Sequence, residues 1–168
     1  MKRFGFVALL ATVVIVAFMV TGCRAELPTI SNPQNEPFEQ QVLELTNSER
    51  VAHGLAPLQW HNRVATAARS HSADMAINKV FSHTGSDNSS VRDRLNRHKV
   101  ENLRTWGENI AAGQRTPETV VQAWMDSPGH RANILNASYT HIGIGVYELE
   151  KSQYQIYWTQ KFAAFHGD

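Results

Sequence analysis

Apolar and small residues recur at helical spacing in the first half of the chain. One such stretch ends at a glycine stop signal, and its inward positions are Phe38, Val42, Leu45 and Thr46. This spacing predicts a helix over Glu39–His53. The same periodicity returns in His61–Lys79, where many alanines favour helix and allow close packing. The pattern therefore predicts two amphipathic helices, joined by a turn that contains Pro57.

Two shorter helices are predicted from their capping residues. The polar segment 84–90 ends in two serines, either of which is suited to cap a helix over Val91–His98. Thr116 is suited to cap the second helix, which has Pro117 at its first helical position and runs through Met125. Local backbone chemistry, more than periodicity, predicts where both helices begin.

The clearest strand signals lie near the C-terminus. His141–Glu148 and Tyr154–Ala163 are rich in β-branched and aromatic residues, and a short polar turn separates them. This combination is typical of a β-hairpin. Because helices dominate the first part of the chain and strands the last, the sequence predicts an α+β fold.

The N-terminus has the pattern of a lipoprotein signal peptide. Lys2 and Arg3 precede seventeen apolar or small residues, Phe4 to Val20, and small residues then lead to Cys23. A membrane-spanning helix needs about 20 residues, so an uncleaved anchor helix is the weaker alternative. We therefore predict that residues 1–22 are removed and that Cys23 is lipidated, which places the exported chain at the bacterial cell envelope or outside the cell.

The rest of the chain is predicted to be a tether followed by one domain. Residues 23–37 comprise the lipidated cysteine and a flexible linker rich in Pro, Asn, Gln and Glu, and residues 38–168 form the domain. With a single cysteine no disulfide forms within the chain, so the domain depends on its own core. Without the signal peptide, fourteen basic residues face 15 acidic ones, a balance that argues against nucleic-acid binding.

Candidate chemistry centres on a few polar residues at element boundaries. His83, His130 and His141 lie beside glycine, acidic or turn residues, where side chains are usually exposed, and Glu108 follows Gly107. Two imidazoles and a carboxylate suit Zn²⁺ or another divalent metal, and they also suit acid/base chemistry without metal. Alternatively, each histidine caps a helix or bonds a nearby carbonyl.

Several other features have simpler interpretations. His71 lies on the apolar face of its helix, which is typical of a hydrogen-bonded core histidine. The four tryptophans are interpreted as core residues: Trp60, Trp106, Trp124 and Trp158. The common motifs of metalloproteases, serine hydrolases and nucleotide-binding loops do not occur, and the sequence therefore does not support those classes.

Many ordered motifs resemble the CAP superfamily, which groups cysteine-rich secretory proteins, antigen 5 of venoms and plant pathogenesis-related proteins. The motifs cover most of the mature chain and include Leu45-Thr46-Asn47, Phe81-Ser82-His83, Gly107-Glu108-Asn109, Gly129-His130-Arg131, Ile142-Gly143-Ile144-Gly145 and Tyr157-Trp158-Thr159-Gln160. The absence of paired cysteines places the chain closest to a disulfide-free bacterial branch.

The resemblance implies a three-layer α-β-α sandwich with a central antiparallel sheet. It also implies a broad cleft with two histidines and two acidic residues, in which the histidines bind zinc or another divalent ion. His83, His130 and Glu108 match three of these positions, and Asn109 follows Glu108 in its motif. The second acid does not carry over, because its position is held by Ser127. Asp126 lies one residue earlier and is expected to point elsewhere on a helix.

Three functions are compatible with this sequence. The preferred hypothesis is a membrane-tethered binding module whose cleft recognises a lipid, glycan or peptide, with any metal in a positioning role. The alternative is a zinc-dependent hydrolase of peptide or cell-wall substrates, in which His83 and His130 hold the metal and Glu108 is the general base. The third is a structural component of the cell envelope or spore coat.

Overall fold

The structure, a computed structural model, describes residues 35–168 of the protein. The predicted signal peptide, Cys23 and most of the predicted linker lie outside these residues. The helices and strands follow in the order α1 (Glu36–Ala52), β1 (Gln59–Trp60), α2 (Asn62–Ile77), α3 (Val91–Arg97), β2 (Leu103–Ala112), α4 (Pro117–Asp126), α5 (Pro128–Ile134), β3 (His141–Glu148) and β4 (Ile156–Phe165).

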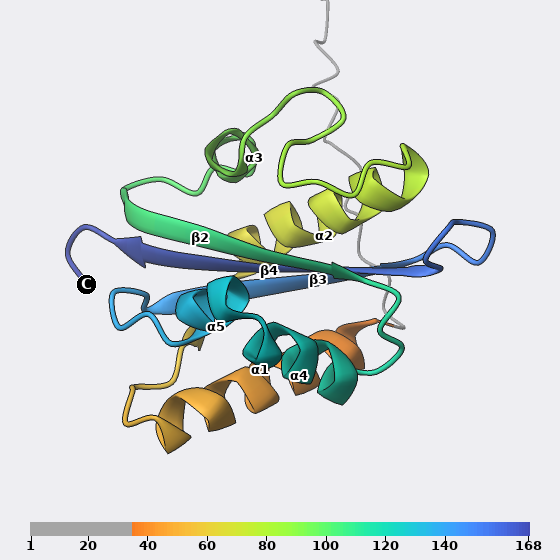
Figure 1. The fold of residues 1–168 in the computed structure, drawn as a ribbon. Helices are drawn as coiled ribbons and strands as arrows, with labels where there is room; N and C mark the ends of the chain where they lie inside the picture. The colour runs from red at the N-terminus through yellow and green to blue at the C-terminus, as the bar shows by residue number, and fades with distance from the viewer. Residues whose placement is uncertain (1–34) are drawn as a thin grey trace, which may run out of the picture.

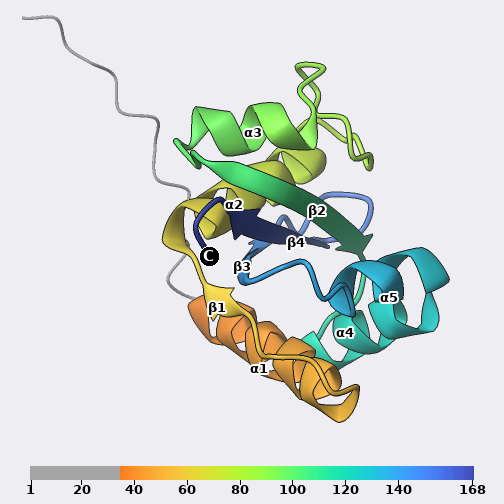
Figure 2. The ribbon, with the colours of Figure 1, turned by 90° about the vertical axis from the view of Figure 1, so that its left-hand side faces the viewer.

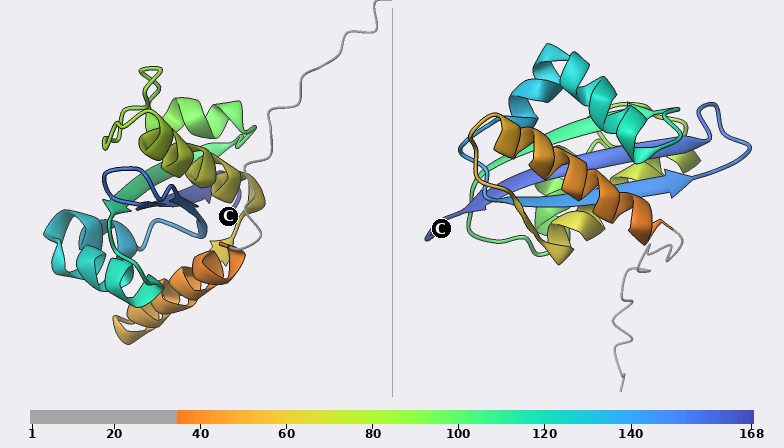
Figure 3. Two further views of the ribbon diagram at one scale, coloured as in Figure 1. Left: turned by 90° about the vertical axis from the view of Figure 1, so that its right-hand side faces the viewer. Right: turned by 90° about the horizontal axis from the view of Figure 1, so that it is seen from below.

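The elements form three layers around one sheet with the strand order β1-β3-β4-β2. β4 pairs antiparallel with both β3 and β2, whereas the two-residue β1 pairs parallel with β3. Figures 1 and 2 show α2 and α3 on one face of the sheet and α1, α4 and α5 on the other. Seen from below in Figure 3, α1 crosses the sheet and packs beside α4. The predicted sandwich and the predicted β-hairpin are confirmed.

The four predicted helices are all present, with small shifts at their ends. α1 begins at Glu36, inside the predicted linker, because Pro37 fits the first helical turn, where N–H groups have no intrahelical partner. His61, predicted as the first residue of α2, caps that helix by accepting a hydrogen bond from the backbone of Val64. Ser90 caps α3 and Thr116 caps α4, as predicted.

Two elements that carry site residues were missed by the sequence analysis. β2 lacks a run of branched residues, because Gly107, Glu108 and Asn109 occupy its centre. α5 has only seven residues and begins directly after α4, with no hydrogen bond from a capping side chain. Neither element has the periodicity that identified the longer ones.

Two glycines of β3 allow α2 to lie directly on the sheet. An ideal Cβ on Gly143 would lie 2.1 Å from the backbone nitrogen of Ala65, and one on Gly145 would lie 2.1 Å from that of Arg69. Real carbon and nitrogen atoms do not approach this closely without displacement. The alternating glycines thus set the distance between β3 and α2, and the isoleucines beside them face the opposite layer, within the larger apolar core.

The outer edge of β2 is covered by side chains of the lower layer and of the segment after α5. Three alternate backbone carbonyls accept hydrogen bonds there, namely Trp106 O from Tyr139 Oη, Glu108 O from Asn133 Nδ2 and Ile110 O from Trp124 Nε1, each at 3.2 Å. An edge strand with occupied carbonyls is a poor template for another strand. These contacts also hold α4 and α5 beside β2.

The tryptophans divide into buried and exposed side chains. Trp124 and Trp158 are buried and Trp60 packs partly against the core, as predicted. Trp106 is 40% exposed, and the guanidinium of Arg92 lies 4.8 Å from its ring centroid. The prediction that Trp106 is a core residue was therefore wrong, because its side chain projects at the sheet edge. Within residues 35–168, no helix combines the length and apolar character needed to cross a bilayer.

Candidate functional site

The centre of the candidate site is the buried carboxylate of Glu108 on β2, which is surrounded by basic side chains. His83 Nδ1 donates a hydrogen bond to Oε1 at 2.8 Å, and Arg94 Nη2 donates to Oε2 at 3.0 Å. Lys161 Nζ, from β4, also donates to Oε2. His71 Nε2, from α2, lies 3.6 Å from Oε1. Both carboxylate oxygens are therefore occupied by partners from the protein itself.

The basic partners keep Glu108 ionised. Burial alone would raise the pKa of Glu108. The hydrogen bond from His83 and the positive charge of Lys161, with a lesser contribution from Arg94, nevertheless hold that pKa well below its usual range. Burial lowers the pKa of Lys161 to about 8 against the attraction of Glu108, so its ammonium is protonated at neutral pH. A carboxylate with so low a pKa is a poor proton acceptor.

His71 is a core histidine, but it is not hydrogen-bonded as the sequence analysis expected. Its side chain is fully buried, and neither ring nitrogen has a hydrogen-bond partner among the described residues. Burial lowers the pKa of His71 to about 4, although the charge of Glu108 opposes this shift. The ring is therefore neutral at pH 7, and Oε1 of Glu108 already accepts hydrogen bonds from His83 and Arg94.

Arg94 of α3 fixes the backbone around His83. Its Nη2 donates to the carbonyl of His83 at 2.8 Å, and its Nη1 donates to the carbonyl of Ser89 at 2.8 Å. The His83 side chain is 53% exposed. Because the ionised Glu108 only accepts hydrogen bonds, Nδ1 of His83 carries the proton and Nε2 of the neutral ring is left with a free lone pair.

His130 is held on the opposite side of the β2 edge by α5. Asn109 Nδ2 donates to the carbonyl of His130 at 3.1 Å, and Asn133 Nδ2 donates to Oδ1 of Asn109 at 2.9 Å. The buried guanidinium of Arg50 donates to the carbonyl of Ile134 at 2.8 Å, at the last turn of α5. These contacts fix the backbone that carries His130 from both ends of the helix.

His130 borders a pocket that is separate from the exposed His83 ring. Burial lowers the pKa of His130, and the charge of a protonated His83 lowers it further. A pocket of about 270 Å³ adjoins His130, and its other lining residues are Phe81, Ile110, Ala111, Ala112, Gln114, Ala123, Trp124 and Ser127. His130 thus borders a pocket whose other lining side chains are uncharged and mainly apolar.

The remaining predicted positions divide between this cleft and other surfaces. Ser127 lines the pocket, whereas the exposed Asp126 accepts a hydrogen bond from Gln122 at 2.9 Å and lies outside it. His141 begins β3, which β4 separates from β2; its Nδ1 lies 3.6 Å from a carboxylate oxygen of Asp168, and its ring packs against His61. The structure therefore places His141 and Asp126 outside the candidate site.

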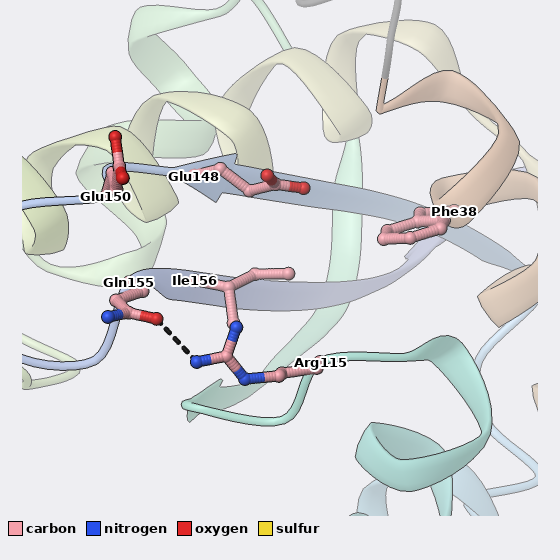
Figure 4. A pocket seen from close by; sticks show the side chains of 6 residues that line it. All are labelled: Phe38, Arg115, Glu148, Glu150, Gln155 and Ile156. Carbon is pink, nitrogen blue, oxygen red and sulfur yellow. Dashed lines mark hydrogen bonds between the residues drawn. The ribbon is translucent and has the colours of Figure 1, made fainter.

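A second pocket, of about 350 Å³, lies between the start of α1 and the β3–β4 turn and contains none of the predicted site residues (Figure 4). Phe38, which stacks on Trp158, lines one end, Glu150 lines the other end, and Glu148 lies between them. Arg115 donates to Oε1 of Gln155 and so ties the hairpin turn to the segment before α4.

The candidate metal donors in this region are two imidazoles, because the Glu108 carboxylate is occupied by protein partners. Among residues 35–168, no group of three or more His, Cys, Asp or Glu side chains is arranged to hold one ion. His83 and His130 supply two imidazoles, and Glu108 contributes through its hydrogen bond to His83. A carboxylate behind a histidine ligand fixes the ring's tautomer and orientation and raises its basicity.

Sequence reasoning missed three residues of this cluster: His71, Arg94 and Lys161. Lys161 gave a usable signal, because it interrupts an otherwise uncharged segment of β4 in which every neighbour is buried. A lysine in such a strand needs a buried acidic partner. Arg94 gave no comparable signal, because α3 contains several arginines and nothing in the sequence distinguishes this one. His71 gave none either, because a histidine on the apolar face of an amphipathic helix such as α2 is usually a core residue.

Comparison with known proteins agrees with the fold and the motifs. The profile of CAP, the cysteine-rich secretory protein family, matches residues 43–162. The chain belongs to this family. It is 44% identical over 135 residues to the uncharacterized protein YkwD of Bacillus subtilis. The aligned residues cover 80% of this chain and 50% of YkwD. It is also 44% identical over 108 residues to the uncharacterized membrane protein YlbC of the same organism, covering 64% of this chain and 31% of YlbC.

Solved structures of CAP-family proteins share the architecture. An extracellular protein with an SCP domain from Bacillus anthracis superposes with a TM-score of 0.69 and 38% identity, over 76% of this CAP-family chain and 40% of that protein. A cysteine-rich secretory protein from Staphylococcus aureus gives a TM-score of 0.61 over 81% of this chain and 40% of its own, and its 24% identity supports the fold alone. The chain thus spans half or less of these longer relatives.

Proposed function

We propose that this CAP-family protein is an exported binding module, held at the cell envelope by a lipid on Cys23. Its cleft binds a divalent metal through His83 and His130, and a small ligand binds beside the metal. The lipoprotein pattern around Cys23 supports the export and the anchor. The extracellular relative from Bacillus anthracis and the membrane protein YlbC are compatible with a location outside the cytoplasm.

The observation that carries this proposal is the occupied carboxylate of Glu108. A zinc hydrolase of the kind considered above needs Glu108 as a general base with an accessible, moderately basic oxygen. Here, Lys161, Arg94 and His83 take up both oxygens and lower the pKa of the group. Glu108 therefore acts on His83 by orienting its ring, which is a role in binding. A bound metal would supply a Lewis-acidic position for a ligand oxygen or nitrogen.

Removal of either imidazole is expected to abolish metal binding. His83→Ala and His130→Ala should each remove zinc uptake in calorimetric titration of the purified protein, because each removes one of the two proposed imidazole ligands. Circular dichroism should show that both variants remain folded, since His83 is exposed and His130 is partly so. His141→Ala is the matched control and should bind zinc as the original protein does. The proposal would be contradicted if the unmodified protein took up no zinc, or if both cleft variants bound zinc with unchanged affinity.

Metal affinity is expected to depend on pH in the range of histidine titration. Metal competes with the proton for imidazole, so affinity should be constant at high pH and fall as the histidines protonate below about pH 6.5. Because burial and the charge of His83 lower the pKa of His130, the loss should extend to a lower pH than it would for two unperturbed histidines. Zinc titrations at several pH values between 8 and 5 measure this dependence, and a flat profile would argue against histidine ligation.

A further inference from the structure

Three of the five large apolar side chains that are exposed within residues 35–168 lie at one end of the sandwich. Ile77, the last residue of α2, is 55% exposed, Phe81 is 48% exposed, and Tyr154 on the β3–β4 turn is 37% exposed. The ring centroids of Phe81 and Tyr154 lie 5.7 Å apart. Figure 1 shows the end of α2 and the β3–β4 turn at the same end of the sheet.

The two segments that carry these side chains, 77–82 and 151–155, contain two lysines and no acidic residue. Both lysines are exposed, and together with the apolar side chains they form what we call the end surface: Ile77, Lys79, Phe81, Lys151 and Tyr154. Glu148 and Glu150, which precede the turn, line the pocket on its α1 side (Figure 4). Aromatic rings bordered by lysines are typical of protein surfaces at the boundary between a membrane and water.

The end surface is held in place by the core beneath it. Tyr154 packs edge-on against the buried Tyr157, with centroids 5.8 Å apart. Tyr157 belongs to the same core cluster as Met75 and Ala76 of α2, against which Leu149 also packs. The exposed rings are therefore presented by a folded part of the domain, and a partner that binds them does not have to order a loose segment.

The predicted tether joins the domain at this same end. α1 begins at Glu36, and Phe38 in its first turn lines one pocket with Gln155 of the β3–β4 turn (Figure 4). Residues 24–35 connect the predicted lipidation site, Cys23, to α1, and a chain of that length spans at most about 40 Å when fully extended. A surface kept this close to a bilayer has a high effective concentration there, so a weak interaction is sufficient for docking.

The other two exposed apolar side chains lack this combination. The Trp106 ring has the guanidinium of Arg92 over it, 4.8 Å from the centroid. Val51 lies near the far end of α1, about 22 Å along the helix from its start. A specific protein interface takes about 20–30 residues from each partner, whereas a few rings and lysines can lie in a headgroup layer. The end surface therefore fits a lipid bilayer better than a protein.

We infer that the end surface docks into the headgroup layer of the bilayer that carries the lipid on Cys23. The rings of Phe81 and Tyr154 lie at the level of the headgroups. The ammonium groups of Lys79 and Lys151 bind lipid phosphates. Because Phe81 also lines the pocket of about 270 Å³, docking brings that pocket to the membrane surface. This inference rests on the proposed lipid anchor and is independent of the proposed metal.

A fluorescent label on the β3–β4 turn tests this inference. Cys23 is the only cysteine and its thiol carries the proposed lipid, so an introduced cysteine is the only one that takes the label. The lipidated protein with Gln153→Cys, labelled with nitrobenzoxadiazole, is placed in vesicles of phosphatidylcholine and phosphatidylglycerol. Its emission should shift to the blue, and lipids with a nitroxide near the headgroup should quench it. Val51→Cys is the matched control, because this exposed position lies away from the end surface, and its label should remain in water.

Two double variants of the labelled protein identify the groups that dock. Ile77→Ser with Tyr154→Ser should lose the blue shift and the quenching. Both side chains are exposed, so circular dichroism should remain unchanged. Lys79→Gln with Lys151→Gln should lower the ratio of quenched to unquenched label by about fivefold for each charge removed, and this effect should be absent in vesicles of phosphatidylcholine alone.

The outcomes distinguish the docked surface from the anchor and from the metal site. Protein that does not stay with the vesicles would contradict the anchor and the docking together. Anchored protein whose label at position 153 is quenched no more than the label at position 51 would overturn the docking alone. Unchanged quenching in the Ile77→Ser and Tyr154→Ser double variant would also overturn it. Zinc uptake by the same samples concerns only the metal site, so either proposal can fail without the other.

Discussion

Lys161→Met is expected to lower the free energy of unfolding by about 3–5 kcal/mol, the usual cost of removing one partner from a buried ion pair. Lys161 is fully buried, and its ammonium donates to the Glu108 carboxylate, which is also buried. Methionine fills a similar volume but leaves that negative charge compensated mainly by Arg94 and the hydrogen bond from His83. Urea denaturation followed by circular dichroism measures the change.

Two further variants show whether the loss comes from the ion pair. Lys151→Met, on the exposed β3–β4 turn, removes the same charge from the surface and should change stability by less than about 0.5 kcal/mol. The double variant with Glu108→Gln and Lys161→Met should lose less than the sum of the two single losses, because the unpaired charge is then gone. Additive losses, or a Lys161→Met protein of nearly unchanged stability, would show that the pair contributes little.

Gly145→Ala is expected to cost more than about 3 kcal/mol or to prevent folding, because overpacking against rigid backbone is poorly relieved. The added methyl would lie 2.1 Å from the nitrogen of Arg69 and 2.4 Å from the carbonyl carbon of Ala68. Both are backbone atoms of α2, so a side-chain rotation cannot make room. The helix would have to move away from the sheet that it covers.

Gly129→Ala provides the matched control for this variant. A Cβ at Gly129 meets no atom within 4 Å, and the residue lies in α5, where alanine is the better helix former. It should be neutral or slightly stabilising. Thermal and urea denaturation of the two alanine variants, together with the unmodified protein, measure the difference. A Gly145→Ala protein as stable as Gly129→Ala would contradict the close contact between β3 and α2.

The sequence predicted the elements that have strong local signals and missed those defined by distant contacts. Capping residues placed the starts of α3 and α4, and branched residues placed β3. β2 was missed because its central residues have low strand propensity and make contacts with distant parts of the chain. Glu108, for example, accepts a hydrogen bond from Lys161 on the neighbouring strand. Propensity describes single segments and carries no information on such pairs.

The candidate site was predicted in outline by residue type and motif, while its electrostatics required the structure. The motifs selected His83, Glu108 and His130. The structure places His83 against Glu108, and the backbone of His130 accepts a hydrogen bond from Asn109, the residue after Glu108. The sequence could not reveal that Lys161 and Arg94 neutralise the same carboxylate, because these residues meet only through the fold. That neutralisation changes the interpretation of Glu108 from a general base to a group that orients His83.

The most direct test of the proposed metal site is a crystal structure of the zinc-loaded protein, with the ion located by anomalous diffraction at the zinc edge. The account predicts one ion bound by Nε2 of His83 and by a ring nitrogen of His130, at the usual 2.0–2.1 Å or so for zinc and imidazole. Glu108 should remain bound to Lys161 and to Nδ1 of His83. An ion coordinated by Glu108 itself, or one found only away from His83 and His130, would contradict it.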